Sequence, residues 1–148
     1  MKVSLILRHA IEAGGLSTED KDNAKNAVKN ILLAGRRDEK ERVDSLFSCL
    51  AGDDDTDVIR DLIQSESASN RIEGVRSLLR LDTTTQKRFL AELIPLLDDT
   101  DRSTRDLALY VIRLIKGEKA TNLLPDAEFS AQSARIKAWW IEMENEKE

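Results

Sequence analysis

The chain has 148 residues, with 23 basic and 28 acidic side chains, 41% hydrophobic residues, 4% aromatic residues, 6 glycines and 2 prolines. This length is typical of one domain, and strand-forming and turn-forming residues are scarce beside the many Leu, Ile, Val and Ala. The composition disfavours an all-β fold, a disordered acidic tail and a two-domain enzyme. We therefore expect a single all-α domain over residues 1–148.

The cysteine count and the pattern of apolar residues indicate the cellular compartment. The single Cys49 excludes an intramolecular disulfide, which fits a reducing compartment, and no Cys/His spacing points to a metal. The apolar run at residues 3–7 is too short for a secretory signal. No segment approaches the roughly 18 uncharged apolar residues of a membrane span. We predict a cytoplasmic protein with no cofactor, no metal and no membrane partner.

Apolar residues recur at helical spacing along nearly the whole chain, which predicts about eight helices with short connections. Short connections make neighbouring amphipathic helices antiparallel. The predicted elements, in chain order, are a terminal helix, three helical hairpins and a last helix, at residues 2–13, 18–51, 55–81, 86–117 and 126–144.

Three local details refine these elements. Asp82 and the three threonines that follow it predict a turn. Pro95 lies near the end of the next helix and is expected to kink it. Apolar side chains cover most of the circumference of residues 107–115, so this helix is predicted to be buried between neighbours and to end at Gly117.

The sequence also repeats at a spacing of 34 residues. A shift of this length places apolar residues over apolar residues and keeps small residues aligned. It aligns Leu93, Leu96, Leu97, Arg105 and Ala108 with Ile59, Leu62, Ile63, Arg71 and Gly74.

The residues of the last copy resemble a HEAT repeat of the armadillo-like helical repeat family. The segment Leu-Ile-Pro-Leu-Leu-Asp-Asp at 93–99 is followed by Asp101, Thr104, Arg105, Ala108, Val111, Ile112 and Ile115 at the family's spacing. The resemblance is good over residues 86–117, moderate over 55–81 and poor over 18–51. It implies a right-handed stack of antiparallel hairpins, an α-solenoid.

The same resemblance implies contacts between repeats. In that family the turn Asp and the Arg of the second helix in neighbouring repeats are structural partners, which assigns Asp101 and Arg105 to a ladder between repeats. Ser67 stands where the middle copy should have Asp. The repeat frame also has an alternative, in which Asp55 and Val58 open the second helix of a hairpin begun by the preceding helix.

Acidic residues concentrate in the centre of the chain, where residues 53–101 carry 12 acidic and 6 basic side chains. Much of the excess lies in two runs between predicted helices, at 53–57 and 98–101. For the first run we expect a solvated turn whose aspartates cap the next helix. These aspartates are the predicted contacts to a basic protein partner, together with Trp139: Asp53, Asp54, Asp55, Asp57, Asp98, Asp99 and Asp101.

The first acidic run imitates a calcium-binding loop but departs from it twice. Asp53, Asp55 and Asp57 match the first ligands of such a loop. Val58 stands where the loop needs Gly, and Gln64 stands where it needs a bidentate Glu. A helix-capping turn is the favoured interpretation, and a weak surface cation site is the alternative.

Trp139 lies on a charged face of the last helix, apart from the apolar face of Phe129, Ser133, Ile136, Trp140 and Met143. An aromatic residue on a charged face is typical of a protein interface. The alternative is that its ring lies over neighbouring residues at the edge of the core.

No catalytic motif is present. Cys49 could use only His9 as a base, and a buried cysteine with a surface histidine is the favoured interpretation. The leading hypothesis is therefore a non-catalytic interaction protein. Its sharper form is an acidic immunity protein that neutralises a basic toxin domain. The alternatives are a scaffold or assembly adaptor, or a HEAT-like protein that handles nucleic acid or a cofactor-bearing protein.

The nucleic-acid alternative needs a basic concave stripe. Net acidity argues against a general nucleic-acid binder, because phosphate recognition needs clustered Lys and Arg. The candidate stripe consists of Arg71, Arg76, Arg80, Arg105 and Arg113.

Overall fold

The computed structural model describes residues 14–34, 46–121 and 123–148. The predicted terminal helix at 2–13, with His9, and residues 35–45 of the predicted hairpin at 18–51 lie outside the described residues. Within these ranges the chain is all-helical and contains no strand, as predicted. The elements are α2 (Thr18–Ala34), α4 (Leu46–Leu50), α5 (Thr56–Ile63), α6 (Ala68–Ser77), η1 (Leu78–Arg80), α7 (Thr83–Lys87), α8 (Leu90–Leu93), η2 (Ile94–Asp98), α9 (Arg102–Ile115) and α10 (Asp126–Asn145).

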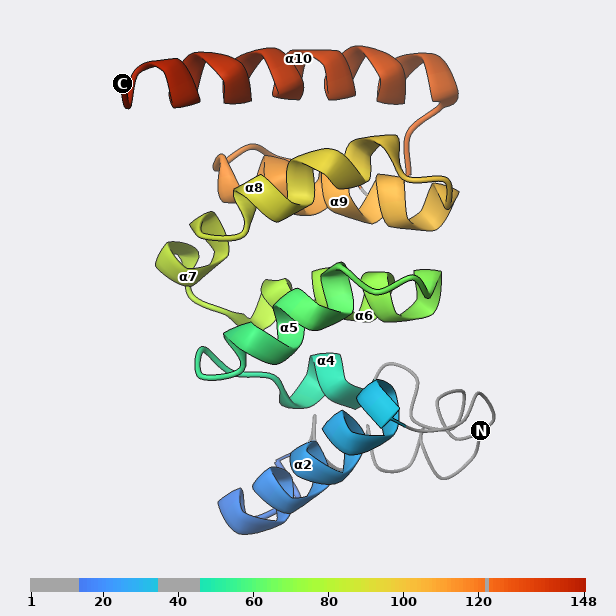
Figure 1. The fold of residues 1–148 in the computed structure, drawn as a ribbon, viewed down its shortest axis with the longest axis vertical. Helices are drawn as coiled ribbons and strands as arrows, with labels where there is room; N and C mark the ends of the chain where they lie inside the picture. Colours follow the sequence, from blue (N-terminus) through green and yellow to red (C-terminus); the bar gives the residue numbers. More distant parts are fainter. Residues whose placement is uncertain (1–13, 35–45, 122) are drawn as a thin grey trace.

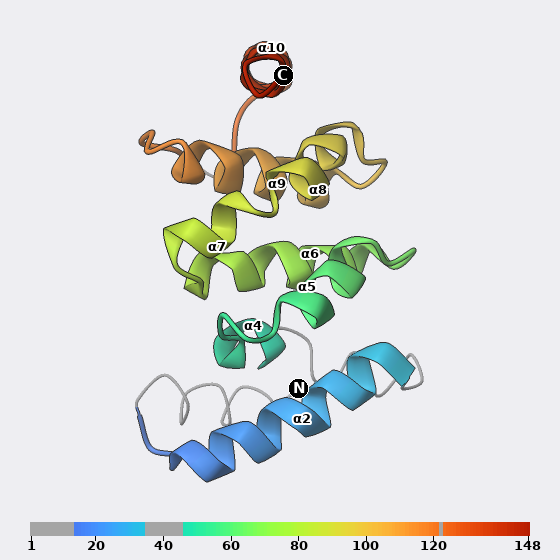
Figure 2. The ribbon, with the colours of Figure 1, turned by 60° about the vertical axis from the view of Figure 1, so that its left-hand side comes forward.

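The helices form layers that follow chain order (Figure 1). α5 packs against α6, and α8 and η2 pack with α9. α6 contacts α9 on one side and α4 on the other, and α4 also contacts α2. α10 contacts α9 and η2 and lies alone at the end of the series, where Figure 2 shows it end-on.

A continuous apolar core runs through these layers. Phe47 of α4, Ile59 of α5, Phe89 before α8, Ile112 of α9 and Ile136 of α10 are each 0% exposed. Burial of such side chains contributes about 1.5–3 kcal/mol each to folding. Because every layer supplies part of the core, the layers stabilise one another.

The burial of residues 107–115 in α9 is confirmed for most of the range; Leu114 is exposed, and Tyr110 and Arg113 are half-buried. Gly117 ends the helix as predicted, with a positive φ of 80°. The Gly117 N–H donates to the Leu114 carbonyl and the Glu118 N–H to the Arg113 carbonyl. This pair of hydrogen bonds is the Schellman motif, and it favours glycine at the left-handed position.

The helix that was predicted to follow the turn at Asp82, with a kink at Pro95, is divided into two short helices. These are α8 and the 3-10 helix η2, and α7 precedes them. Pro95 lies in the first turn of η2 and has no N–H to continue an α-helical ladder. Asp82 and its threonines begin α7 where a turn was predicted, because the Asp82 carboxylate accepts the Thr85 N–H at 2.7 Å.

Two arginines separated by 34 residues make equivalent contacts. Arg71 donates to the carbonyls of Ser65 and Glu66 at 3.0 and 2.8 Å, and Arg105 donates to the carbonyl of Asp99 at 2.7 Å. Each arginine therefore closes the connection that precedes its own helix. Arg71 also reaches the next layer, where its Nη2 and Nε lie 2.9 and 2.8 Å from the two oxygens of Asp99. The Nη2 contact is a charge-assisted hydrogen bond, which is stronger than a bond between neutral groups, and the Nε distance adds the attraction of an ion pair.

The contact between layers thus joins Arg71 to Asp99. The implied ladder of Asp101 and Arg105 is wrong for Asp101, whose carboxylate accepts the backbone N–H and the hydroxyl of Thr104, both at 2.8 Å. These hydrogen bonds cap α9 and lower the pKa of Asp101. Asp101 therefore hydrogen-bonds within its own helix, and it interacts with Arg71 and Arg105 only through charge, which lowers its pKa further.

Gly74 is the point of closest approach between α5 and α6. A Cβ at this position would lie 2.9 Å from the Ile63 backbone nitrogen, the Ile63 Cγ1 and the Leu62 Cβ. The aligned position in α9 is Ala108, which is fully buried. The absence of a side chain at Gly74 therefore allows the two helices to pack closely.

Candidate functional site

The acidic turn between α4 and α5 contains a buried ionic cluster. The Asp55 side chain is 1% exposed, and its Oδ2 lies 2.9 Å from the Lys25 Nζ, while Lys29 pairs with Oδ1. The Gly52 N–H donates to the same carboxylate at 2.8 Å. The prediction of a solvated turn is therefore wrong at Asp55, which connects this turn to α2.

The cluster determines the charge state of Asp55. Burial alone opposes ionisation, but hydrogen bonds from Lys29, from the Gly52 N–H and from Lys25 outweigh it, and the pKa of Asp55 lies below its ordinary value. Asp55 is thus an ionised internal anchor with two cationic partners of its own. Its carboxylate is therefore not accessible to another protein.

The other acidic residues of this turn lie at the surface. Asp54 is 83% exposed and 3.9 Å from Lys25, and Asp57 is 99% exposed and 3.9 Å from Arg60. Asp53 is exposed as well, but its carboxylate accepts the Asp82 N–H at 3.1 Å. Asp54 and Asp57 therefore remain the most accessible carboxylates of the predicted surface.

The second acidic run is also committed mainly to internal contacts. Asp99 holds Arg71, and Asp101 caps α9. Asp98 is exposed, and its two oxygens accept hydrogen bonds from the Lys137 Nζ of α10 at 2.7 and 2.8 Å. This pair connects η2 to the last helix.

Most arginines of the candidate basic stripe have acidic or carbonyl partners. Besides Arg71 and Arg105, Arg76 lies 3.4 Å from Glu73, and Arg113 lies 3.1 Å from Glu118. Arg80 is exposed at the end of η1. Paired arginines have less charge to give to phosphates, which weakens the nucleic-acid alternative.

A different feature appears where α10 crosses the ends of α8 and α9. The predicted apolar face of α10 does point inward: Ser133 and Ile136 are buried, and Phe129, Trp140 and Met143 are half-buried. This face packs on the core.

Trp139 is half-buried against the core as well. It belongs to the edge of the core, which is the second of its two sequence interpretations, and it also forms one wall of an open pocket.

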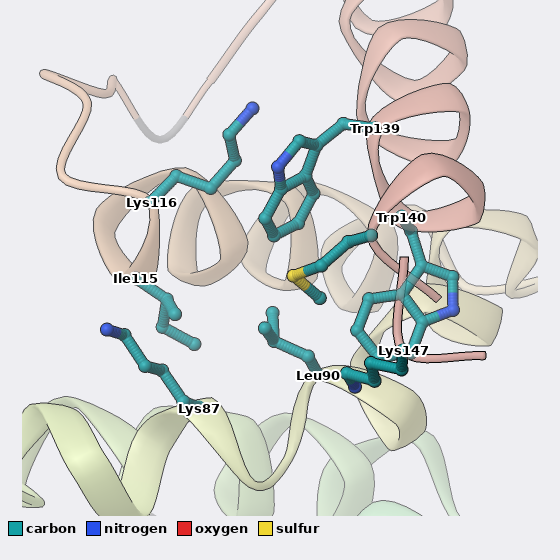
Figure 3. A pocket seen from close by; sticks show the side chains of 8 residues that line it. Lys87, Leu90, Ile115, Lys116, Trp139, Trp140 and Lys147 are labelled. Atoms are coloured by element: carbon teal, nitrogen blue, oxygen red, sulfur yellow. The ribbon is translucent and has the colours of Figure 1, made fainter. Parts of the chain in front are cut away.

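The pocket has a volume of about 440 Å³ and is lined by residues of α7, α8, the end of α9 and α10 (Figure 3). Its apolar side chains are Leu90, Ile115, Trp139, Trp140 and Met143. The two tryptophan rings are 6.5 Å apart between centroids and tilted by 58°. The volume falls within the roughly 300–1,000 Å³ range of ligand pockets.

Three lysines, Lys87, Lys116 and Lys147, complete the lining of the pocket. The Lys116 Nζ lies 4.4 Å from the centroid of the Trp139 ring, and the Lys147 Nζ lies 5.4 Å from that of Trp140. These cation–π contacts place positive charge directly beside the aromatic walls. The pocket is therefore cationic at its edges although the protein has a net charge of −5.

Glu118 supports the Lys116 side of this pocket. Its carboxylate lies 3.2 Å from Lys116, 3.1 Å from Arg113 and 2.8 Å from Arg135 of α10. Hydrogen bonds from Arg135 above all, with those from Arg113 and Lys116, overcome partial burial and lower the pKa of Glu118 to about 2. The ionised Glu118 connects the end of α9 to α10 and holds Lys116 near Trp139.

The sequence predicted a binding role for Trp139, which forms one wall of this pocket, but not for the three lysines. Lys87, Lys116 and Lys147 lie far apart in the chain, and each is an ordinary surface lysine in its local pattern. The one local signal was the pair of adjacent tryptophans in a chain with few aromatic residues. Only the crossing of α10 over α8 and α9 brings the lysines to the same opening.

The remaining candidates are placed as follows. Cys49 is buried in α4, as predicted. Within the described ranges, no three His, Cys, Asp or Glu side chains are grouped so that they could hold a metal ion. The helices described by the structure are all too short or too polar to cross a membrane.

Comparison of the chain with models of known protein families, with curated proteins and with solved structures gave no match.

Proposed function

We propose that the protein is a non-catalytic protein-binding module, built as a right-handed stack of HEAT-like antiparallel hairpins with α10 as its last helix. The paired layers of α5 with α6 and of α8 with α9 support this architecture. The equivalent contacts of Arg71 and Arg105 support the 34-residue repeat. Helical stacks of this kind present extended surfaces for recognition.

The observation that carries the binding function is the lysine-rimmed pocket against α10. Two tryptophans and a methionine form part of its lining, and tryptophan is among the residues that contribute most to binding energy at interfaces. Catalysis by nucleophile and base would need paired reactive groups. The lining supplies apolar area and lysine charge, which suits recognition without turnover.

Site-specific photo-crosslinking in the source cell tests this proposal. A benzophenone amino acid replaces Ala91, which is exposed on α8 beside the lining residue Leu90. The matched control carries it at Asn26, exposed on α2 at the other end of the structure (Figure 1). We expect a discrete crosslinked partner from Ala91 alone, and its loss in a folded Trp139→Ala variant. Equal crosslinking at both positions, or none at Ala91, contradicts the proposal.

A second candidate keeps the acidic turn as the contact to a basic partner, in the form of an immunity or inhibitor protein. The exposure of Asp54 and Asp57 favours it, because exposed carboxylates steer a basic protein toward its binding site. A scaffold or assembly adaptor would differ only in its partner. A cytoplasmic location is part of both proposals and is supported by the single buried thiol of Cys49.

The test of this second candidate must leave Asp55 intact, because that residue belongs to the buried cluster. Replacing Asp54 and Asp57 together by asparagine should slow association with a basic partner and flatten its salt dependence. Association at the wild-type rate at low salt would remove the electrostatic role of the turn.

A further inference from the structure

We infer that the lysine-rimmed pocket binds an acidic peptide segment of a partner protein. One aromatic or long aliphatic side chain of the segment enters between the tryptophans, and Asp or Glu residues on either side of it pair with the lysines. This inference rests on the proposed binding function and names the chemical class of its partner.

The apolar part of the pocket determines which peptide side chain can enter it and anchor the peptide. A volume of about 440 Å³ lies toward the lower end of the size range of ligand sites, which suits one large side chain better than a whole helix face. Trp139 and Trp140 offer tilted aromatic surfaces for an edge or face contact. Met143, flexible and polarisable, adapts to the shape of the inserted group.

The lysines of the pocket determine which peptide residues can lie on either side of that side chain. Lys87 is exposed, and Lys147, which follows the end of α10, is 61% exposed with the Glu144 carboxylate at 2.6 Å. Exposed pairs of this kind contribute about 0–1 kcal/mol, so a peptide carboxylate can replace Glu144 without a large loss. Lys116 remains paired with Glu118 and positions the Trp139 ring. Lys87 and Lys147 are therefore the residues that select for acid.

The placement of the lysines favours a peptide over a small carboxylate. In Figure 3 the side chains of Lys87, Lys116 and Lys147 lie at different sides of the opening and do not converge on one point. A single carboxylate would reach one ammonium group at a time. A peptide with acids on both sides of its anchor reaches two of them together, and complementary charge of this kind gives specificity.

The experiment begins with selection from a random library of peptides of about twelve residues, displayed on phage, against the full chain. We expect enrichment of peptides that carry Phe, Trp, Leu or Met with acids on both sides.

A labelled synthetic peptide of the enriched sequence is then titrated with the protein by fluorescence polarisation. Replacing Lys87 and Lys147 together by glutamate should weaken its binding at least about tenfold, because the rim then repels the peptide's acids. Lys21→Glu in α2 controls for the reversal of a distant positive charge, at half the charge change of the double variant, and should stay within about twofold of wild type at moderate salt, where distant charges are screened. Both lysines of the pocket rim are exposed, so these variants are expected to fold, which circular dichroism checks.

The outcomes separate the inference from the proposal it rests on. Enrichment of neutral or basic peptides whose binding is lost in a folded Trp139→Ala variant would overturn the acidic class and leave the pocket as a binding site. Acidic peptides that bind the double lysine variant as well as wild type would also overturn it. A selection that yields no peptide dependent on Lys87, Lys147 or Trp139 would overturn both.

Discussion

Replacing Asp55 by asparagine keeps the size of the side chain and removes its charge from a buried position beside Lys25 and Lys29. Loss of one partner from a buried ion pair costs about 3–5 kcal/mol of folding stability, because the remaining charge has no counterpart. The two lysine side chains are 13% and 21% exposed, so they can turn partly toward water. We therefore expect a loss of about 2–3 kcal/mol, below the full buried cost.

Urea unfolding followed by circular dichroism measures this loss. With a slope of about 1–3 kcal/mol per molar urea for a protein of this size, the midpoint should fall by about 1 M or more. Asp54→Asn is the matched control, since its side chain is 83% exposed in the same turn, and it should change the midpoint little. Equal midpoints for the two variants would refute the structural role of Asp55.

The pH dependence of folding stability tests the same contact, because protonation of Asp55 in acid removes the charge that the asparagine variant lacks. The pKa of Asp55 is lower in the folded protein than in the unfolded chain. Its contribution to stability is therefore complete above the unfolded pKa of about 3.9 and is lost as pH falls through the folded value. The Asp55→Asn variant should show a shallower loss of stability over this acidic range than wild type.

Three further predictions concern stability. Gly74→Ala should cost about 1–2 kcal/mol in urea unfolding, because overpacking costs about 1–3 kcal/mol against Ile63 and alanine returns up to about 1 kcal/mol of helix propensity. Asp101→Ala should cost about 1 kcal/mol, since the cap of α9 at Thr104 is lost. Glu118→Gln should make thermal stability less dependent on pH, because wild type loses the Glu118 contribution as pH falls from 4.5 to about 2.

Each of these predictions has an outcome that contradicts it. Ser69→Ala, on an exposed position of α6, should be neutral or slightly stabilising, and a Gly74→Ala variant as stable as Ser69→Ala would show that α5 and α6 can separate without cost. An Asp101→Ala variant as stable as wild type would mean that water replaces the cap. Parallel melting curves of wild type and Glu118→Gln across the acidic range would show that Glu118 stabilises nothing when ionised.

Features that depend on neighbours along the chain could be predicted from the amino-acid sequence. Helical spacing of apolar residues predicted the all-α class and the buried circumference of α9, and Gly117 predicted its end, because a helix forms from contacts within one or two turns. A shift of 34 residues aligned Arg71 with Arg105, and the structure gives these two arginines equivalent contacts. The sequence pattern at Asp82 and Pro95 predicted a turn and a kink, whereas the structure has the start of α7 and the 3-10 helix η2 there. Helix boundaries of this kind are decided over only a few residues.

The burial of charged residues and the contacts between distant segments could not be predicted in this way, because they depend on how the helices pack. Asp55 and Asp57 look alike in sequence, yet one is enclosed by Lys25 and Lys29 and the other is 99% exposed. The same holds for the pocket, whose lysines come from three separate segments. Desolvation and charge pairing depend on groups that are distant in the chain, so no local pattern contains them until α2 and α10 are packed in place.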